Sequence, residues 1–250
     1  MRSDKYSDEV NKTGAEAEDK NSRKADLSRL RKRELLEIIA GLQTPTSGSI
    51  EYHDPSNNKT VDLRSKTPLQ IRDLGVRLSF VPEDRLGMGL VGNMDIIDNM
   101  MLRSFRNGNS AFTDRKGPKE LAEKVVKELE VSTPGTTTPV RRLSGGNVQK
   151  VLVGREIASS PTVLLSAYVV RGLDINSSYT IYDLINLQKK KGVAVIYVGE
   201  DLDVLLELCD RILVLCGGKV SGVVENPTPD DKRKVGLMMT KLGGGEDDEQ

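Results

Sequence analysis

The sequence predicts an α/β fold: a mostly parallel sheet flanked by helices on both faces. Apolar strands alternate with amphipathic helices from residue 162 to residue 224. These strands are continuous apolar runs, which is typical of strands that are buried on both faces. A length of 250 residues also provides ample material for one large core.

Composition excludes several classes of protein. The 37 Lys and Arg residues balance the 37 Asp and Glu residues, so no net field attracts nucleic acid or an anionic membrane. No apolar run approaches the roughly 20 residues of a transmembrane helix, and the polar start does not resemble a secretory signal. Cys209 and Cys216 lack the spacing of metal ligands, which favours reduced, buried thiols. We therefore expect a cytoplasmic protein without a metal site, a transmembrane segment or a nucleic-acid partner.

The two ends of the chain differ from its middle. Residues 1–33 are dominated by charged and small polar side chains, and large apolar residues are almost absent before Leu27. Such a composition buries too little surface to offset the entropy of ordering, so we expect disorder over this divergent segment. The ordered domain is expected over residues 34–242, and the acidic tail over residues 243–250 is expected to fray.

The first elements of the domain follow from apolar periodicity and turn residues. Leu35, Leu36, Ile38 and Ile39 form a broad apolar helix face, and Gly41 ends it. The elements expected in this half are a helix over 34–42, strands over 48–52 and 76–81, and helices over 95–105 and 118–131. A loop is expected over 106–117 and a linker rich in Pro, Gly and Thr over 133–138.

The second half alternates regularly. The elements expected there are a helix from 145 through 157, a strand over 162–167, a helix over 175–190, a strand over 193–198, a helix over 201–208, strands over 211–216 and 219–224, and a last helix near 230–240.

The most informative segment is the turn that opens the helix after residue 144. Its residues are Leu143, Ser144, Gly145, Gly146, Asn147, Val148, Gln149 and Lys150. Two glycines behind a serine leave backbone N–H groups uncovered at the positive end of a helix, which is a ready site for an anion. Alone, the same residues indicate only a serine cap with a flexible entry turn. Here an apolar strand and then Arg171, Gly172, Leu173 and Asp174 follow about twenty residues later.

In this order and spacing, the two segments resemble the signature motif and the D-loop of an ATP-binding-cassette (ABC) ATPase domain. From residue 34 to about residue 242, the chain resembles the ATPase subunits of ABC importers for simple sugars and nucleosides, and especially their second cassette. Residues 34–42 are similar to the helix after the phosphate loop. Glu83, Asp84 and Arg85 are similar to the Q-loop, and Glu200 and Asp201 to the switch region.

The resemblance implies a P-loop-NTPase-like sheet with a helical signature subdomain over about residues 95–160. It also implies a function for each motif. Leu143, Ser144, Gly145, Gly146 and Gln149 would contact ATP held by another cassette, beside the D-loop residues Gly172, Leu173 and Asp174. Glu83, Asp84, Arg85 and residues 95–105 would couple to membrane permeases, and Glu200 and Asp201 would act as a switch.

Two departures from the family pattern concern the chemistry. No glycine lies between Gly14 and Gly41, so the phosphate-binding loop (Walker A) is missing, and the strands that should precede it are missing as well. Ala167 and Tyr168 occupy the positions of the two Walker B carboxylates, and neither side chain can hold Mg²⁺ or act as a base at neutral pH. Intrinsic hydrolysis is therefore not expected and no catalytic residue is assigned. ATP and Mg²⁺ would bind only through a partner cassette, if at all.

Four hypotheses stay open. The chain is a degenerate ABC subunit that completes an ATP site in trans, in a head-to-tail dimer with another cassette, at the inner face of the cell membrane. Alternatively, it is a nucleotide-independent interaction module, or a truncated relic in which the lost strands leave exposed sheet edges. An ABC ATPase of the DNA-repair type is disfavoured by zero net charge and by the absence of a long coiled-coil insertion.

Overall fold

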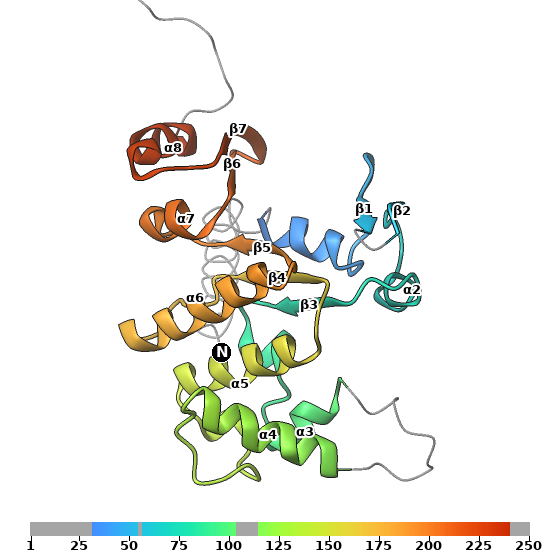
Figure 1. Ribbon diagram of the computed structural model, residues 1–250, viewed down its shortest axis with the longest axis vertical. Coiled ribbons are helices and arrows are strands. Elements are labelled where there is room, and N and C mark those ends of the chain that lie inside the picture. Colours follow the sequence, from blue (N-terminus) through green and yellow to red (C-terminus); the bar gives the residue numbers. More distant parts are fainter. Residues whose placement is uncertain (1–31, 55–56, 104–114, 241–250) are drawn as a thin grey trace, which may run out of the picture.

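The computed structural model describes residues 32–54, 57–103 and 115–240 (Figure 1). The disorder expected near the N-terminus and the acidic tail expected over 243–250 lie outside these residues, as does most of the loop expected over 106–117. Within the described part, no helix is both long and apolar enough to cross a membrane.

The centre of the fold is a three-stranded parallel sheet. Its strands, in their order across the sheet, are β3 (Leu78–Val81), β4 (Val163–Ala167) and β5 (Ala194–Val198). The central strand β4 is buried at every residue, since it pairs with a strand on each side and is covered on both faces. This sheet and its flanking helices confirm the α/β fold that the apolar runs predict.

The sheet is interrupted after β5. The next two strands, β6 (Arg211–Cys216) and β7 (Lys219–Glu225), form a separate antiparallel hairpin. Gly217 and Gly218 form its turn with φ angles of 54° and 76°, as a tight hairpin requires. No ladder of hydrogen bonds joins β5 to β6 among the described residues. The parallel sheet thus consists of β3, β4 and β5, and the strands expected over 211–216 and 219–224 lie outside it.

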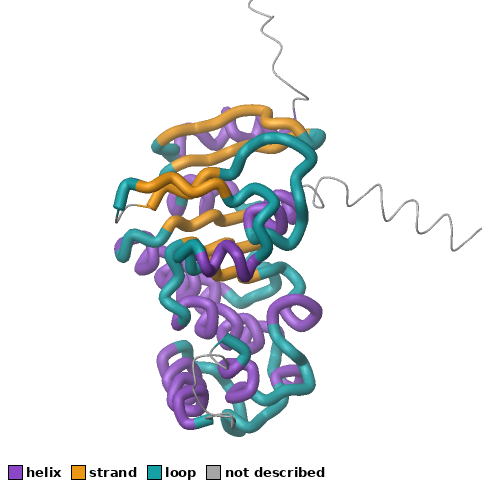
Figure 2. Tube along the Cα trace, turned by 90° about the vertical axis from the view of Figure 1, so that its right-hand side faces the viewer, coloured by secondary structure: helices purple, strands orange, loops and turns teal. Residues whose placement is uncertain are grey.

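Four helices follow in the expected order in the second half. They are α5 (Gly145–Ala158), α6 (Ile175–Lys190), α7 (Leu202–Leu208) and α8 (Lys232–Thr240). The first three begin after Ser144, Asp174 and Asp201, whose side chains accept hydrogen bonds from amides of the first turn. Helix α5 contacts β3 and α6, and α8 covers β6 and β7. Figure 2 shows the strands gathered in one part of the molecule, with a strand-free part of helices and loops beyond them.

The region before β3 is more structured than expected. A helix covers residues 32–39, and β1 (Glu51–Asp54) pairs antiparallel with β2 (Lys59–Asp62). A short helix, α2 (Pro68–Asp73), follows. Thr67 and Gln70 form a capping box at its start, and Pro68 occupies the first helical position. This is a local start signal for a helix within a polar segment.

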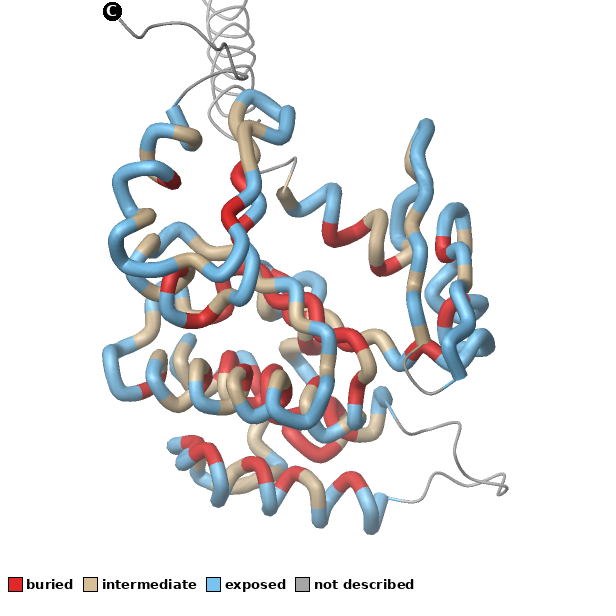
Figure 3. Tube along the Cα trace, turned by 45° about the horizontal axis from the view of Figure 1, so that its top comes forward, coloured by how far each residue is buried: buried red, intermediate tan, exposed pale blue. Residues whose placement is uncertain are grey.

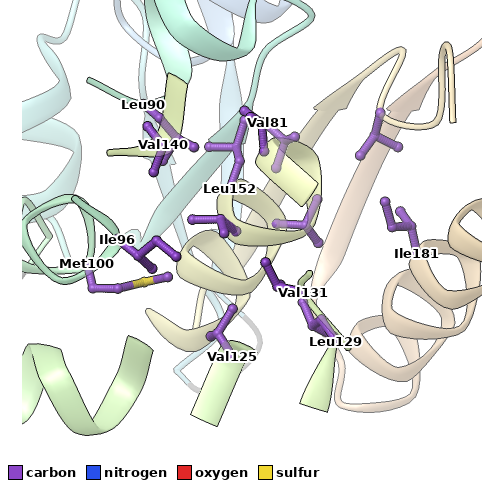
Figure 4. Close-up of a cluster of buried hydrophobic side chains, with 14 of the residues drawn as sticks. Val81, Leu90, Ile96, Met100, Val125, Leu129, Val131, Val140, Leu152 and Ile181 are labelled. Carbon is purple, nitrogen blue, oxygen red and sulfur yellow. The ribbon is translucent and has the colours of Figure 1, made fainter. Parts of the chain in front are cut away.

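The helical part contains α3 (Ile96–Met101), which packs against α4 (Lys116–Glu128), and α4 packs against α5. Their apolar side chains meet those of β3 and β4 in the largest core cluster, and buried residues concentrate along α5 and β4 (Figure 3). Figure 4 shows Val125 of α4, Leu129 at the C-cap of α4 and Leu152 of α5 in this cluster. Helices α4 and α5 are in tight contact at Gly154, where an added Cβ would lie 2.5 Å from the Val125 Cγ1.

A buried carboxylate joins the helical part to the sheet. Glu156 of α5 is 1% exposed and accepts hydrogen bonds from Arg103, Arg155 and the Phe80 amide. The pKa of Arg155 is lowered to about 10, mainly by burial and to a smaller extent by the positive charge of Arg103. Two guanidinium groups and one backbone amide thus provide this buried carboxylate with hydrogen-bond donors, as a buried acidic group requires.

Candidate functional site: the signature turn and its neighbours

The signature turn lies at the surface, at the start of a 14-residue helix. Ser144 caps this helix: its hydroxyl accepts from the Asn147 amide at 3.4 Å and from the Asn147 Nδ2 at 2.9 Å. Ser144 and Gly145 are exposed, whereas Leu143 packs partly into the core. The turn therefore presents its small residues to the surroundings while its flanks are held by the core.

Arg85 connects this turn to the D-loop. Its Nη1 donates to the Gly145 carbonyl at 3.0 Å, and its Nη2 donates to the Arg171 carbonyl. Partial burial lowers the pKa of the Arg85 guanidinium. A planar fork of donors suits two separate carbonyls in a way that a lysine ammonium does not. Three segments that are distant in sequence are thus fixed at one place by one side chain.

A second link lies beside the first. Arg171 pairs with Glu83 through its Nη1, and both side chains are partly exposed. Gly172 follows with a φ of 70°, which reverses the chain toward Leu173. An added Cβ on Gly146 would lie 3.6 Å from the Leu173 Cδ2, so the D-loop borders the signature turn.

Two acidic residues of the predicted site act as caps. Asp84 accepts from the Gly87 amide at 2.8 Å and opens a π-helical turn, η1 (Arg85–Gly89). Asp174 accepts from the Ser177 hydroxyl at 2.7 Å and from the Ser177 amide at 2.9 Å. These bonds lower the pKa of the Asp174 carboxyl, and the bond from the Ser177 hydroxyl has the largest effect. Both residues are exposed, and their carboxylates orient the loops through these hydrogen bonds.

Gln149 is placed differently from the rest of the signature turn. It is fully buried in α5, and neither its Nε2 nor its Oε1 has a hydrogen-bond partner among the described atoms. The structure thus separates Gln149 from the exposed surface formed by Ser144 and Gly145.

The switch-like residues form a separate feature after β5. Glu200 and Asp201 are exposed, and Asp201 caps α7 by accepting from the Asp203 amide at 3.0 Å. Beside them, burial raises the pKa of the Tyr197 hydroxyl in the preceding strand.

The end of β4 does not fit a metal ion. Ala167 and Tyr168 are 4% and 7% exposed, and both pack into a core cluster with the helix over 32–39. Tyr168 adopts a φ of 49°, an uncommon conformation for a bulky side chain. No group of three or more His, Cys, Asp or Glu residues in the described ranges is arranged to hold a metal ion. The residues present here do not fit Mg²⁺.

One residue of the cluster was missed as a site candidate. Arg171 directly precedes the predicted D-loop residues, and its backbone carbonyl and side chain take part in both links. A charged residue between an apolar strand and a glycine turn was the available signal, but its partners Arg85 and Glu83 lie 86 and 88 residues earlier in the sequence.

Comparison with known proteins is consistent with this geometry. Residues 32–166, more than half of the chain, match the family model described as ABC transporter. The chain belongs to the ABC transporter family. The expectation drawn from the signature turn and the D-loop is thereby confirmed.

Curated relatives of this ABC protein include sugar-import ATP-binding proteins. The glucose import ATP-binding protein TsgD13 of Haloferax volcanii is 35% identical over 221 residues, which are 86% of this chain and 38% of that protein. The xylose import ATP-binding protein XylG of Moorella thermoacetica is 39% identical, over 67% of this chain and 32% of that protein. The chain thus spans well under half of the length of these relatives.

Solved structures show the fold. A dimeric ATP-binding cassette in a post-hydrolysis state, with ADP and phosphate bound, has a TM-score of 0.65 at 22% identity, covering 78% of this chain and 80% of that one. A nucleotide-free cassette has a TM-score of 0.62 at 19% identity, covering 82% and 79% of the two chains. The ABC protein therefore has the P-loop-NTPase-like cassette fold.

Proposed function

We propose that this chain supplies the signature face of an ATP site in trans, as a non-hydrolysing ATP-binding subunit of a sugar or nucleoside importer. The observation that carries the proposal is the Arg85 link, which fixes the exposed Ser144–Gly145 turn beside the D-loop at Arg171. A free turn would lose entropy on binding phosphate, whereas a fixed one is already ordered. Its N–H groups would add charge stabilisation to a γ-phosphate held by the partner.

The partner must provide what this chain lacks. Ala167 and Tyr168 offer no ligand for Mg²⁺, so the metal, the phosphate loop and the catalytic carboxylate would all come from a competent cassette in a head-to-tail dimer. Glu83, Arg85 and the α3 region would contact membrane permeases and pass on the state of the ATP site. The chain would then work at the inner face of the membrane without crossing it.

The competing function is a nucleotide-independent interaction module. The observation in its favour is the end of β4, where Ala167 and Tyr168 are incorporated into the core. The relic hypothesis predicts instead that the chain fails to unfold cooperatively.

The experiment replaces one glycine and measures the ATPase rate of the partner cassette. Gly145→Asp places a carboxylate where the γ-phosphate would bind, and we expect it to abolish stimulation of the partner. Folding should be little affected, because the new Cβ would meet only the end of the Arg85 side chain, at 3.0 Å. Circular dichroism checks this.

Gly135→Asp is the matched control. Gly135 lies in the linker before the turn and has open space around its Cβ position, so this variant should stimulate like the unmodified chain. If the unmodified chain stimulates no partner, or if Gly145→Asp stimulates equally well, the turn has no role in trans and the interaction module takes its place.

A further inference from the structure

A large cavity separates the three-stranded sheet from the β6–β7 hairpin. It has a volume of about 980 Å³ and lies between β5 and β6. Every residue from 193 to 199 lines one wall, and every residue from 211 to 215 lines the opposite wall. A wall formed by all consecutive residues of a strand is the edge of that strand, because one face alone would contribute only alternate residues.

Both edges have unused backbone groups. Strand β5 pairs only with β4, and β6 pairs only with β7, among the described strands. Each edge thus presents N–H and C=O groups to the cavity without a neighbouring strand, and such edges accept an added strand readily.

The two edges run in the same direction. Lys189, at the end of the helix before β5, donates to the Leu208 carbonyl at 2.6 Å and to the Asp210 carboxylate at 3.0 Å, just before β6. This link places the amino-terminal ends of β5 and β6 together. One extended segment between them can therefore pair with both edges along their length.

Helices border the cavity, as helices cover the interior of a parallel sheet. Leu35 and Leu36, from the helix over 32–39, line it, and so do residues of α7 and α8, which lie across the strands from that helix in Figure 1. Ile196 and Leu213, on the two walls, are 36% and 47% exposed. Every residue of β4, which has both neighbours, is buried. The apolar surface left at the walls fits an apolar segment.

We propose that this cavity binds an extended apolar segment of about five residues from another polypeptide, which joins the two sheets into one. Lys32 lines the cavity, and the 31 residues before it in the sequence contain no two adjacent large apolar residues. Four cationic residues and one acidic residue line the cavity. Two of the cations are paired with acids, Lys189 with Asp210 and Arg211 with Glu225, so positive charge remains in excess and the segment is flanked by acidic residues. The four are Lys32, Lys189, Lys190 and Arg211, and the acid is Asp210.

The test uses the full chain and a labelled peptide of five alternating valines and isoleucines, preceded by two glutamates. Fluorescence anisotropy measures binding, and amide exchange locates it. We expect saturable binding that protects the β5 and β6 amides from exchange. A matched peptide with proline at the central position should bind at least about tenfold more weakly, because proline removes an N–H donor and cannot occupy a central strand.

Two variants of the chain locate the site. Leu213 and Val223 face each other across the hairpin and are 47% and 44% exposed, but only Leu213 lines the cavity. Leu213→Glu should weaken peptide binding by roughly tenfold or more, because a charge enters an apolar site. Val223→Glu should leave binding unchanged.

Four results would overturn the proposal. The first is no saturable binding of the valine and isoleucine peptide. The second is equal binding of the proline peptide, which would indicate an apolar cavity without strand pairing. The third is protection of both edges in the free chain, which would assign the cavity to the chain's own segment. The fourth is a self-associated chain that Leu213→Glu converts to a monomer, which would identify a second copy as the occupant.

Discussion

Arg85 donates a hydrogen bond of 3.0 Å to the carbonyl of Gly145, a residue 60 positions later in the sequence. The same guanidinium also donates to the Arg171 carbonyl. These bonds hold the first turn of α5 against the loop after β4 without using any side chain of the signature residues. The small residues of the turn thus remain free for an anion while their backbone is fixed.

Replacing Arg85 should loosen both loops without unfolding the domain. In Arg85→Lys, one ammonium cannot serve both carbonyls, and the loss of about 1.4 kcal/mol corresponds to roughly tenfold faster amide exchange over residues 144–147 and 171–174. Hydrogen exchange with mass spectrometry measures this. Arg72→Lys, at an exposed residue of α2, is the control. Unchanged exchange in Arg85→Lys would contradict a fixing role for the bonds.

The approach of α4 to α5 should not tolerate a methyl group at Gly154. An alanine Cβ would lie 2.5 Å from the Val125 Cγ1 and 3.2 Å from the Leu129 Cδ1. We expect Gly154→Ala to lower the free energy of unfolding by about 1–3 kcal/mol. Urea denaturation measures this. In Gly236→Ala, where α8 has open space, the same change should raise it by about 0.5–1 kcal/mol. Similar effects of the two variants would show that the helices are not in close contact.

Asp174 should make stability depend on acidic pH. Its carboxylate caps α6 through Ser177, which lowers its pKa below the ordinary value of 3.8. A lowered pKa in the folded state stabilises the fold above the unfolded value, and this contribution is lost as the pH falls through the folded value. The gap in unfolding free energy between the unmodified chain and Asp174→Asn should therefore close below pH 3.8. A constant gap down to the acid limit would contradict this cap.

The isolated chain should bind Mg-ATP weakly or not at all. The glycine loop is missing from the sequence, and Ala167 and Tyr168 are buried without metal ligands at the end of β4. We expect a dissociation constant above about 1 mM in isothermal titration calorimetry. Micromolar affinity would mean that the phosphate site lies elsewhere in the chain.

Elements with strong local signals could be predicted from the sequence. The helix expected over 175–190 has these bounds in α6, because its Asp174 cap and apolar face are both local. The turn at Ser144 opens its helix as expected. The strand β2 and the helix α2 were missed, because both are short and their polar residues give little periodicity. Only the Thr67 capping box marks the start of α2.

The links within the candidate site could not be predicted. No local pattern in the sequence indicates that Arg85 contacts Gly145 or that Glu83 pairs with Arg171, because both contacts join residues that are distant in the sequence. The burial of Gln149 also depends on which face of α5 meets the core, and that face is set by neighbouring helices.

By itself, the sequence determined the alternation of strands and helices, the signature turn and the D-loop, because apolar period, caps and glycine turns act over a few residues. It also determined that the Walker B carboxylates are replaced by Ala167 and Tyr168 and that no glycine loop precedes the helix over 34–42. Only the tertiary structure decided that Arg85 joins the two loops and that the sheet is open between β5 and β6. Strand pairing and side-chain contacts over long separations depend on how whole elements pack, and no local pattern encodes them.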